Sequence, residues 1–416
     1  MDKLEYYNQV NDIRYQNQIQ LTSQFRFCGN CFRVDTYRGC SHGCKYCFAN
    51  NRMAKGFGGV NNMQLGDHKA IENLFKAAFE SKAPARDLSV ELMRRRVPFH
   101  LGGMSDPFQP REERHQLTLK FLRLSKMFKY PVVISSKIGW EPPDQPSAGS
   151  DTSNGYWDVL DPTLHTWQIS LLGRDEAYVR KFETASSTPD QRIAFIKKLK
   201  KKNFWVAVRI QPLVDLEQAD RVLKDLYGYI DYCTVEHLKL PKFNDKIWDT
   251  VLVHLSNDYK ALLRASPNKP EFELNTRAKL DNILKLKFKY KGLKFGCGDN
   301  DLHEYSDSLN CCGIDTMPPA FNNWLKYNSM YIKMTGDRSQ YIPSCKINGC
   351  FLSDQLKKGW GYKDYVDAYY NTIYEDDRQL SLFSSASPSD VTCDKRDESS
   401  PAGICGGAPE GKGVKS

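Results

Sequence analysis

Three closely spaced cysteines constrain this chain more than any other feature of its sequence. They are Cys40, Cys44 and Cys47, spaced C-x3-C-x2-C within the stretch YRGCSHGCKYCFAN at 37–50. Ferredoxins hold a cubane iron–sulfur cluster with four thiolates, supplied in a C-x2-C-x2-C-x3-C-P run. Here the local run ends at three. If these thiolates hold a 4Fe-4S cluster, one iron keeps an open coordination position, as a cluster that must bind a substrate or cofactor requires.

A structural zinc site is an alternative use of the same cysteines, because such sites are closed by four ligands, often as C-x2-4-C pairs. The spacing alone permits a zinc knuckle formed by Cys28, Cys31, Cys44 and Cys47. Disulfides are disfavoured, since the chain has 13 cysteines, an odd number, and no apolar run of a signal peptide at its polar N-terminus. We therefore expect a reducing, cytoplasmic compartment.

Composition agrees with a globular enzyme. The chain has 416 residues, of which 40% are hydrophobic, and a barrel of about 250 residues would leave room for further segments. No uninterrupted apolar stretch approaches the roughly 18 residues of a membrane helix, so we expect no membrane partner. The net charge of +9 favours an acidic partner.

Short apolar strands alternate with amphipathic helices along residues 33–240. The expected strands are RVDTY at 33–37, a short one in VPFHLGG, PVVISSK at 131–137, WQISLL at 167–172, FWVAVRI at 204–210 and DYCTVEHL at 231–238. The expected helices are 67–96 with a break at Pro84, one carrying Leu117, Phe121 and Leu124 at helical spacing, 189–202, and 216–228. This alternation predicts a parallel α/β sheet. The first strand runs into the cysteines, which places them at the C-terminal ends of the strands, where barrel active sites lie.

The cysteine spacing, with the aromatic Tyr46 before the last cysteine, resembles the signature of the radical S-adenosylmethionine (radical SAM) superfamily. The resemblance implies a partial (β/α)6 barrel and a 4Fe-4S cluster whose fourth iron chelates SAM. It also implies reductive cleavage of SAM to methionine and a 5′-deoxyadenosyl radical, with Tyr46 near the cofactor and a reductant such as flavodoxin or ferredoxin as partner. The protein would bind and orient these groups and exclude water.

Further segments resemble the spore photoproduct lyase-like branch, also described as DNA repair photolyase-like. They are LGGMSDPFQPREER at 101–114, PVVISSK and WQISLL. This likeness implies that Gly102 and Gly103 contact the SAM amino group. Where the branch has a Glu this chain has Met104, so Ser105 or Asp106 is expected to supply that contact. Contacts to ribose or carboxylate are expected from Ser135, Lys137, Ser170 and Arg209.

One departure concerns the substrate. Spore photoproduct lyases use a cysteine between the cluster motif and mid-barrel as hydrogen-atom donor, but this chain has no cysteine between Cys47 and Cys233. The candidates that remain for catalysis are Cys233, Glu236 and His237 on the sixth strand. Three function classes stay open: a radical SAM enzyme acting on nucleic acid, one modifying a peptide or small molecule, and a non-enzymatic zinc-binding module.

Later cysteines suggest a second metal site. We hypothesise an additional iron–sulfur cluster or zinc ion on Cys297, Cys311 and Cys312, with a fourth ligand from Cys345, Cys350 or the Cys28/Cys31 pair. The alternative is free buried thiols. No role is assigned to Cys393 or Cys405. The expected organisation is an N-terminal extension at 1–32, a barrel at 33–240, an extension at 241–381 and a disordered tail at 382–416.

Basic clusters occur at 94–96, in KKLKKK at 197–202, and in KLKFKYKGLK at 285–294. In the last of these Leu286, Phe288 and Tyr290 interleave with lysines. Lysine attracts phosphate and aromatic rings stack on bases, so the pattern is compatible with nucleic-acid binding. Solvated helix faces, and lysines that favour the C-terminal ends of helix dipoles, are the alternative interpretation.

Overall fold

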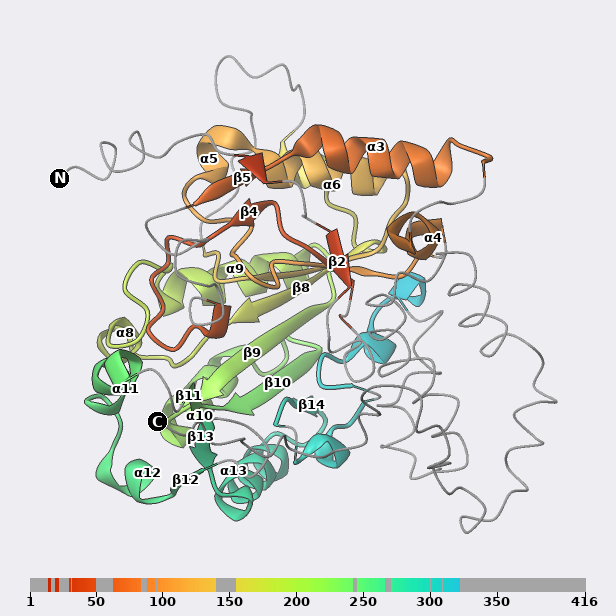
Figure 1. Cartoon of the computed structure of the whole chain (residues 1–416). Helices are drawn as coiled ribbons and strands as arrows, with labels where there is room; N and C mark the ends of the chain where they lie inside the picture. The colour runs from red at the N-terminus through yellow and green to blue at the C-terminus, as the bar shows by residue number, and fades with distance from the viewer. Residues whose placement is uncertain are drawn as a thin grey trace, which may run out of the picture.

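A mostly parallel sheet flanked by helices forms the centre of the molecule (Figure 1). The computed structural model describes residues 14–15, 19–21, 30, 32–49, 63–83, 88–94, 96–139, 155–241, 245–265, 271–299, 301–308 and 310–321. The predicted positions of Cys28, Cys31, Pro84, Cys345, Cys350, Cys393, Cys405 and the tail at 382–416 lie outside these residues.

The main sheet has eight strands in the order β14-β10-β9-β8-β7-β6-β3-β2. Their bounds are β2 Ile19–Leu21, β3 Phe32–Val34, β6 Phe99–Leu101, β7 Val132–Ser136, β8 His165–Ser170, β9 Val206–Leu213, β10 Tyr232–His237 and β14 Lys294–Cys297. All neighbouring pairs from β3 to β14 are parallel, and β2 is antiparallel to β3. The predicted fold class, a partial α/β barrel built on six parallel strands, is confirmed.

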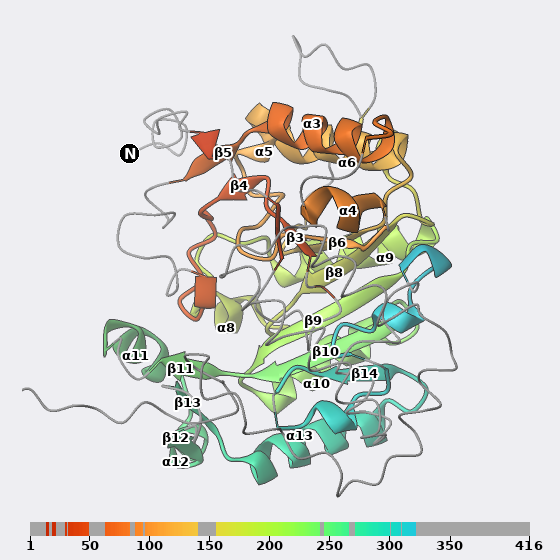
Figure 2. The same ribbon diagram turned by 45° about the vertical axis from the view of Figure 1, so that its right-hand side comes forward.

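Helices follow the strands in the chain and pack on one face of the sheet, which we call the outer face. Their bounds are α3 His68–Phe79, α4 Leu88–Arg94, α5 Glu112–His115, α6 Leu117–Met127, α7 Tyr156–Val159, α8 Glu176–Arg180, α9 Pro189–Lys201, α10 Leu216–Leu226 and α13 Thr276–Lys289. Local sequence sets their starts: Thr188 and Gln191 form a reciprocal capping box at α9, and Pro189 occupies its first turn. In Figures 1 and 2, α3 and α6 lie on the side of the sheet where the strand order ends with β3 and β2. Helices α10 and α13 lie on the opposite side, near β10 and β14.

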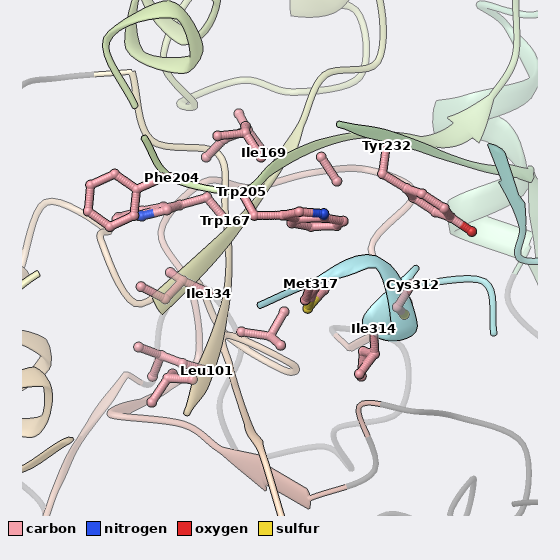
Figure 3. Packing of buried hydrophobic residues seen from close by; sticks show 14 of the residues in the cluster. Leu101, Ile134, Trp167, Ile169, Phe204, Trp205, Tyr232, Cys312, Ile314 and Met317 are labelled. Atoms are coloured by element: carbon pink, nitrogen blue, oxygen red, sulfur yellow. The ribbon is translucent and has the colours of Figure 1, made fainter. Parts of the chain in front are cut away.

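Alternation along β8 separates two faces of the sheet. Trp167 packs edge-on against Phe195 of α9, with ring centroids 5.3 Å apart. Its neighbour Gln168 points the other way, since successive side chains of a strand alternate. We call the face of Gln168, opposite to α9, the inner face; Figure 3 shows part of the core around Trp167.

The first expected strand is divided. Instead of one strand over 33–37, β3 ends at Val34, and Tyr37–Arg38 form β4, which pairs antiparallel with β5, Gln64–Gly66. The break falls at Asp35, whose carboxylate accepts hydrogen bonds from the backbone N–H groups of Met104 and Ser105 at 2.9 and 3.2 Å. The chain therefore leaves the main sheet just before the cysteines. β5 also pairs with β1, Arg14–Tyr15.

The region after residue 240 extends the same architecture. β14 adds a seventh parallel strand beside β10. A separate small sheet is formed by β11 Lys239–Pro241, β12 Leu263–Ala265 and β13 Glu271–Leu274, with α11 Asp245–Leu252 and α12 Asn257–Ala261 between β11 and β12 in the chain. Within the described residues, no helix is long and apolar enough to cross a membrane.

Candidate metal and cofactor site

The cysteine loop, which we define as residues 39–49, docks on the connection that follows β8. Lys45 N–H donates to the Phe182 carbonyl at 2.9 Å, and Ala185 N–H donates to the His42 carbonyl at 3.2 Å. Because this connection begins at the C-terminal end of β8, the loop lies at the C-terminal edge of the parallel sheet. That is the edge where parallel α/β folds place their ligands.

Two residues fix the loop's shape. Gly43 has φ +61°, and a Cβ there would lie 2.7 Å from Thr184 Oγ1, so any side chain at this position would strain the backbone and require Thr184 to shift. The buried Gln109 donates from Nε2 to the Gly39 carbonyl at 3.1 Å and accepts from Ser41 N–H at 3.2 Å. Cys40 is thus clamped between two anchored residues.

The three thiols of the loop are partly buried and form no disulfide. Burial raises the pKa of Cys40 to about 12 and raises that of Cys44 well above its usual value. Since metals bind the thiolate, bound iron would have to displace these protons. A single zinc ion on all three would draw their sulfurs to about 3.8 Å from one another. Among the described residues, Glu273, Asp299 and Asp301 bring three ligand atoms within 4.8 Å of one another, and the three thiols of the loop do not.

Polar atoms beside the cysteines also fit a bound group. Ser41 Oγ and His42 Nδ1 are buried and have no hydrogen-bond partner among the described residues. Both residues lie between Cys40 and Cys44. Buried polar groups normally have partners, and cluster sulfurs accept hydrogen bonds from the surrounding protein. The residues present therefore fit a 4Fe-4S cluster.

A buried carboxylate anchors the end of the loop. The Tyr46 hydroxyl donates to Glu183, which also pairs with Arg192 and lies 3.8 Å from Lys137 Nζ. Burial alone would raise the pKa of Glu183, but Arg192 and Lys137 hold it at about 2. Lys137 Nζ lies 5.7 Å from the Tyr46 ring centroid. Tyr46 and Lys137 were predicted from the sequence, whereas Glu183 was not, because it lies in a loop with no recognisable motif.

The glycine turn after β6 packs against β7. Gly102 has φ +93°, and a Cβ there would lie 2.3 Å from the Ser135 carbonyl oxygen. A Cβ on Gly103 would lie 2.3 Å from Cδ of the flexible Arg33 side chain and 3.5 Å from His100 Nδ1. The Ser105 hydroxyl donates to the Tyr37 carbonyl, so the structure uses it to join the turn to β4. The predicted contact of Gly102, Gly103 and Ser105 with SAM stays a prediction.

Asp106 links three parts of the site. Its carboxylate accepts from the Ser136 hydroxyl at 2.8 Å and from Lys137 N–H at 2.7 Å, and lies 3.2 Å from His42 Nε2. Burial would raise the pKa of Asp106, but His42 and the N–H groups of Lys137 and Phe108 lower it to about 2. Asp106 therefore ties the cysteine loop to the end of β7, and its predicted SAM contact stays a prediction.

A polar network runs across the inner face. Ser135 Oγ lies 2.8 Å from His100 Nε2, accepts from Arg209 Nη1 at 3.0 Å and donates to Gln168 Oε1 at 3.2 Å. Arg209 Nε also donates to Gln211 at 2.9 Å. The structure thus brings together two predicted residues, Ser135 and Arg209. His100, Gln168 and Gln211 were missed, although they follow the period of two that places them on the same face.

The predicted residues at other strand ends lie in different surroundings. The half-buried Ser170 accepts at its carbonyl from Arg192 Nη1 at 2.8 Å. Glu236 pairs with Lys239. Glu236 lies on the inner face beside Gln211, since a Cβ on Gly298 would meet both side chains. His237 is buried, with Nδ1 2.7 Å from Asp299 and Nε2 3.2 Å from Asn282 Nδ2.

Cys233 faces the outer core. It pairs in register with Val208 and Phe295, both buried core residues, and burial raises its pKa. The structure therefore places neither Cys233 nor His237 on the inner face, and Glu236 is the member of this group that lies there. Their catalytic roles stay predictions.

The later cysteines lie on both faces of the sheet. A Cβ on Gly296 would lie 2.1 Å from the Cys311 carbonyl, and Gln168 Nε2 donates to the Cys312 carbonyl at 3.2 Å, so Cys311 and Cys312 lie over the inner face. Their sulfurs are 3.7 Å apart. Cys297, next to Gly296, points to the opposite face. The structure brings together two of the three predicted ligands of a second metal site; Figure 3 shows Cys312 in the core.

Fold and site together define a parallel α/β chain with a three-thiol loop at the C-terminal edge of its sheet. No family model and no curated protein matches the chain. Among solved structures it is similar to spore photoproduct lyase complexed with dinucleoside spore photoproduct, at 13% identity and TM-score 0.44, covering 64% of this chain and 77% of the other. A variant of that lyase with bound AdoMet and the same dinucleoside matches at 14% identity and TM-score 0.45, covering 66% and 78%.

The chain is also similar to SuiB of Streptococcus suis bound to S-adenosylmethionine, at 14% identity and TM-score 0.41. That match covers 73% of this chain and 54% of SuiB, so the chain spans about half of SuiB's length. Because all these TM-scores are below 0.5 and the identities are below 25%, the function of this chain is inferred from its own residues.

Proposed function

We propose that this chain is a radical SAM enzyme whose 4Fe-4S cluster is held by Cys40, Cys44 and Cys47. The observation that carries the proposal is a set of three thiols on one loop, anchored at the C-terminal edge of the sheet, with no fourth cysteine among the described residues of that loop. When bound, such a cluster supplies one electron to S-adenosylmethionine, whose C–S bond breaks to give methionine and a 5′-deoxyadenosyl radical. The electron would come from a reductant such as flavodoxin or ferredoxin.

The chain's own residues would position these groups. Gln109 and Glu183 hold the cysteine loop through hydrogen bonds, and Gly43 provides its positive-φ turn. The inner face supplies hydrogen-bonding groups at Ser135 and Arg209 and a cation at Lys137, which suit the ribose and carboxylate of SAM. Burial of this face would exclude water from a reactive radical.

We infer that the substrate is a nucleic acid, supported by the net charge of +9 and by the lysine-rich clusters. Modification of a peptide or small molecule is the alternative. The salt dependence of nucleic-acid binding distinguishes the two classes, because phosphate contacts make binding weaken steeply as the salt concentration is raised. A chain with no affinity for any nucleic acid at low salt would belong to the alternative class.

The test is anaerobic reconstitution of the full chain with iron and sulfide, followed by reduction and incubation with SAM. We expect about four irons per chain and release of 5′-deoxyadenosine. Replacing Cys40, Cys44 or Cys47 by Ala should abolish both, while Cys233→Ala, on the outer face, should retain both. Intact SAM after incubation with the reduced, fully loaded protein would overturn the proposal, and zinc without iron or sulfide would indicate a structural metal site.

A further inference from the structure

Exposed aromatic rings gather near the C-terminal ends of α9, α10 and α13. Tyr227 is 50% exposed, Tyr229 40% and Phe288 75%. Tyr227 and Tyr229 flank Gly228 in the short connection from α10 to β10, and the Tyr227 ring lies 5.7 Å from that of Tyr290 at the end of α13. Exposed rings that lie close together, unlike single exposed apolar side chains, are a feature of interaction surfaces.

Cations surround these rings. Lys197 Nζ lies 4.7 Å from the Tyr229 ring centroid, and Lys291 Nζ lies 4.7 Å from that of Phe288. A hollow of about 630 Å³ between α10 and the end of α13 is lined by Arg221, Lys224, Tyr227, Lys289, Tyr290 and Lys291, together with two carboxylates. The two lysine-rich stretches recognised in the sequence, at 197–202 and 285–294, thus meet around residues 227–229.

The region remains positively charged because its nearby carboxylates are mostly paired with other cations. Asp220 is paired with Lys289 at 2.6 Å, and Asp225 is paired with Arg174. Among the described residues Arg221, Lys224 and Lys291 have no ion-pair partner, and Glu217 is the remaining acid of the hollow. Lysines in the last turn of a helix are explained by the helix dipole, but Arg221, Lys291 and the exposed rings are not.

We propose that these residues bind single-stranded nucleic acid. We call Arg221, Lys224, Tyr227, Tyr229, Phe288 and Lys291 the basic aromatic surface. Cations that track phosphates, interleaved with rings on which unpaired bases stack, are the features that non-specific single-strand binding needs. A protein partner is disfavoured because lysine is depleted in the cores of protein interfaces.

The basic aromatic surface lies away from the proposed cluster. Residues 227–231 precede β10 and therefore lie at the N-terminal edge of the sheet, whereas the cysteine loop lies at the C-terminal edge. The surface would hold a strand at a distance from the reacting segment. This inference deepens the nucleic-acid part of the proposed function, but it can be tested without cluster or SAM, so failure of one is distinguishable from failure of the other.

The test is fluorescence anisotropy of the full chain, as purified, with labelled twelve-nucleotide oligo-dT, oligo-U and a duplex of the same length. We expect both single strands to bind at 50 mM salt more tightly than the duplex, with a slope of log affinity against log salt of about −2 to −3 for three to four phosphate contacts. The ratio of the affinities for oligo-dT and oligo-U shows whether the surface prefers DNA or RNA.

Matched variants complete the experiment. Lys224→Glu with Lys291→Glu should weaken binding at least tenfold, and Lys69→Glu with Lys82→Glu, the same charge change on and beside α3, should weaken it less than threefold. Tyr229→Ala with Phe288→Ala should weaken binding by roughly thirtyfold or more and leave the salt slope unchanged. Thermal unfolding should show that all variants are folded. Absence of binding at 50 mM salt, equal loss in the control pair, or no effect of the ring substitutions would overturn the proposal.

Discussion

The Tyr46 hydroxyl donates a hydrogen bond to Glu183, so the residue before the last cysteine of the loop is fixed by a carboxylate 137 positions later in the chain. Glu183 in turn is neutralised by Arg192 and Lys137. One end of the cysteine loop therefore depends on a charge network formed by Glu183 of the α8 to α9 connection, Arg192 of α9 and Lys137 after β7.

Replacing Glu183 by Gln should destabilise the metal-free chain by about 3–5 kcal/mol, because a buried Arg192 charge would lose its partner. The comparison is Glu176→Gln, which removes an exposed ion pair with Arg180 and should cost under about 1 kcal/mol. Urea unfolding of the two variants measures the difference. Iron retention after reconstitution should also fall in Glu183→Gln; equal stabilities of the two variants would contradict the assigned role of the network.

Gly102→Ala should destabilise the chain more than Gly228→Ala. Both glycines have positive φ, +93° and +86°, so both substitutions incur backbone strain of about 1–2 kcal/mol. Only at Gly102 does the added Cβ also meet backbone, the Ser135 carbonyl at 2.3 Å, whereas nothing lies within 4 Å at Gly228. The difference between the denaturation midpoints of the two variants measures the effect of the contact at Gly102. Equal midpoints would show that the turn can move away from the added Cβ without loss of stability.

Stability should fall as pH drops below about 6.5, in part because of His165. Burial lowers the pKa of His165 to about 4. Its Nδ1 accepts from Asp161 N–H, and its Nε2 lies 2.9 Å from the Ser125 hydroxyl, so a second ring proton has no acceptor. The unfolded chain binds a proton near pH 6.5 and the folded chain does not, which should cost about 1 kcal/mol between pH 7.5 and 5.5.

His165→Gln removes this titration. Urea unfolding at the two pH values should show a smaller pH dependence in the variant, even if the variant is less stable at both. His100 is shifted in the same direction, so the relevant quantity is the difference between the two proteins. An unchanged pH dependence would contradict the assignment to His165.

The chain should not repair spore photoproduct at a lyase-like rate. No cysteine lies between Cys47 and Cys233 in the sequence, and Cys233 faces the outer core, away from the inner face. The assay is a dimer-containing oligonucleotide with reduced, SAM-loaded protein. Restored thymine over many turnovers would refute this expectation, and Cys233→Ala would then show whether that thiol is the donor.

Local patterns in the sequence were sufficient for the four central strands β7 to β10. Alternation placed β7 to β10 within two or three residues of their observed bounds, because buried parallel strands are apolar and bounded by polar turns. The division of the first strand at Asp35 could not be predicted, since it depends on N–H groups of Met104 and Ser105. Glu183 and Gln109 were missed for the same reason: each acts on the cysteine loop across a sequence distance that no local pattern reports.

Both edges of the barrel strands are closed by segments outside residues 33–240. β2 hydrogen-bonds to β3 at one edge, and β14 to β10 at the other. A truncated fragment that ended after β10 and began at β3 would expose unpaired N–H and C=O groups along both outer strands. Such edges pair with other chains, so the fragment should aggregate on expression. Work on the isolated region that carries the proposed cluster site therefore needs the flanking strands to be retained.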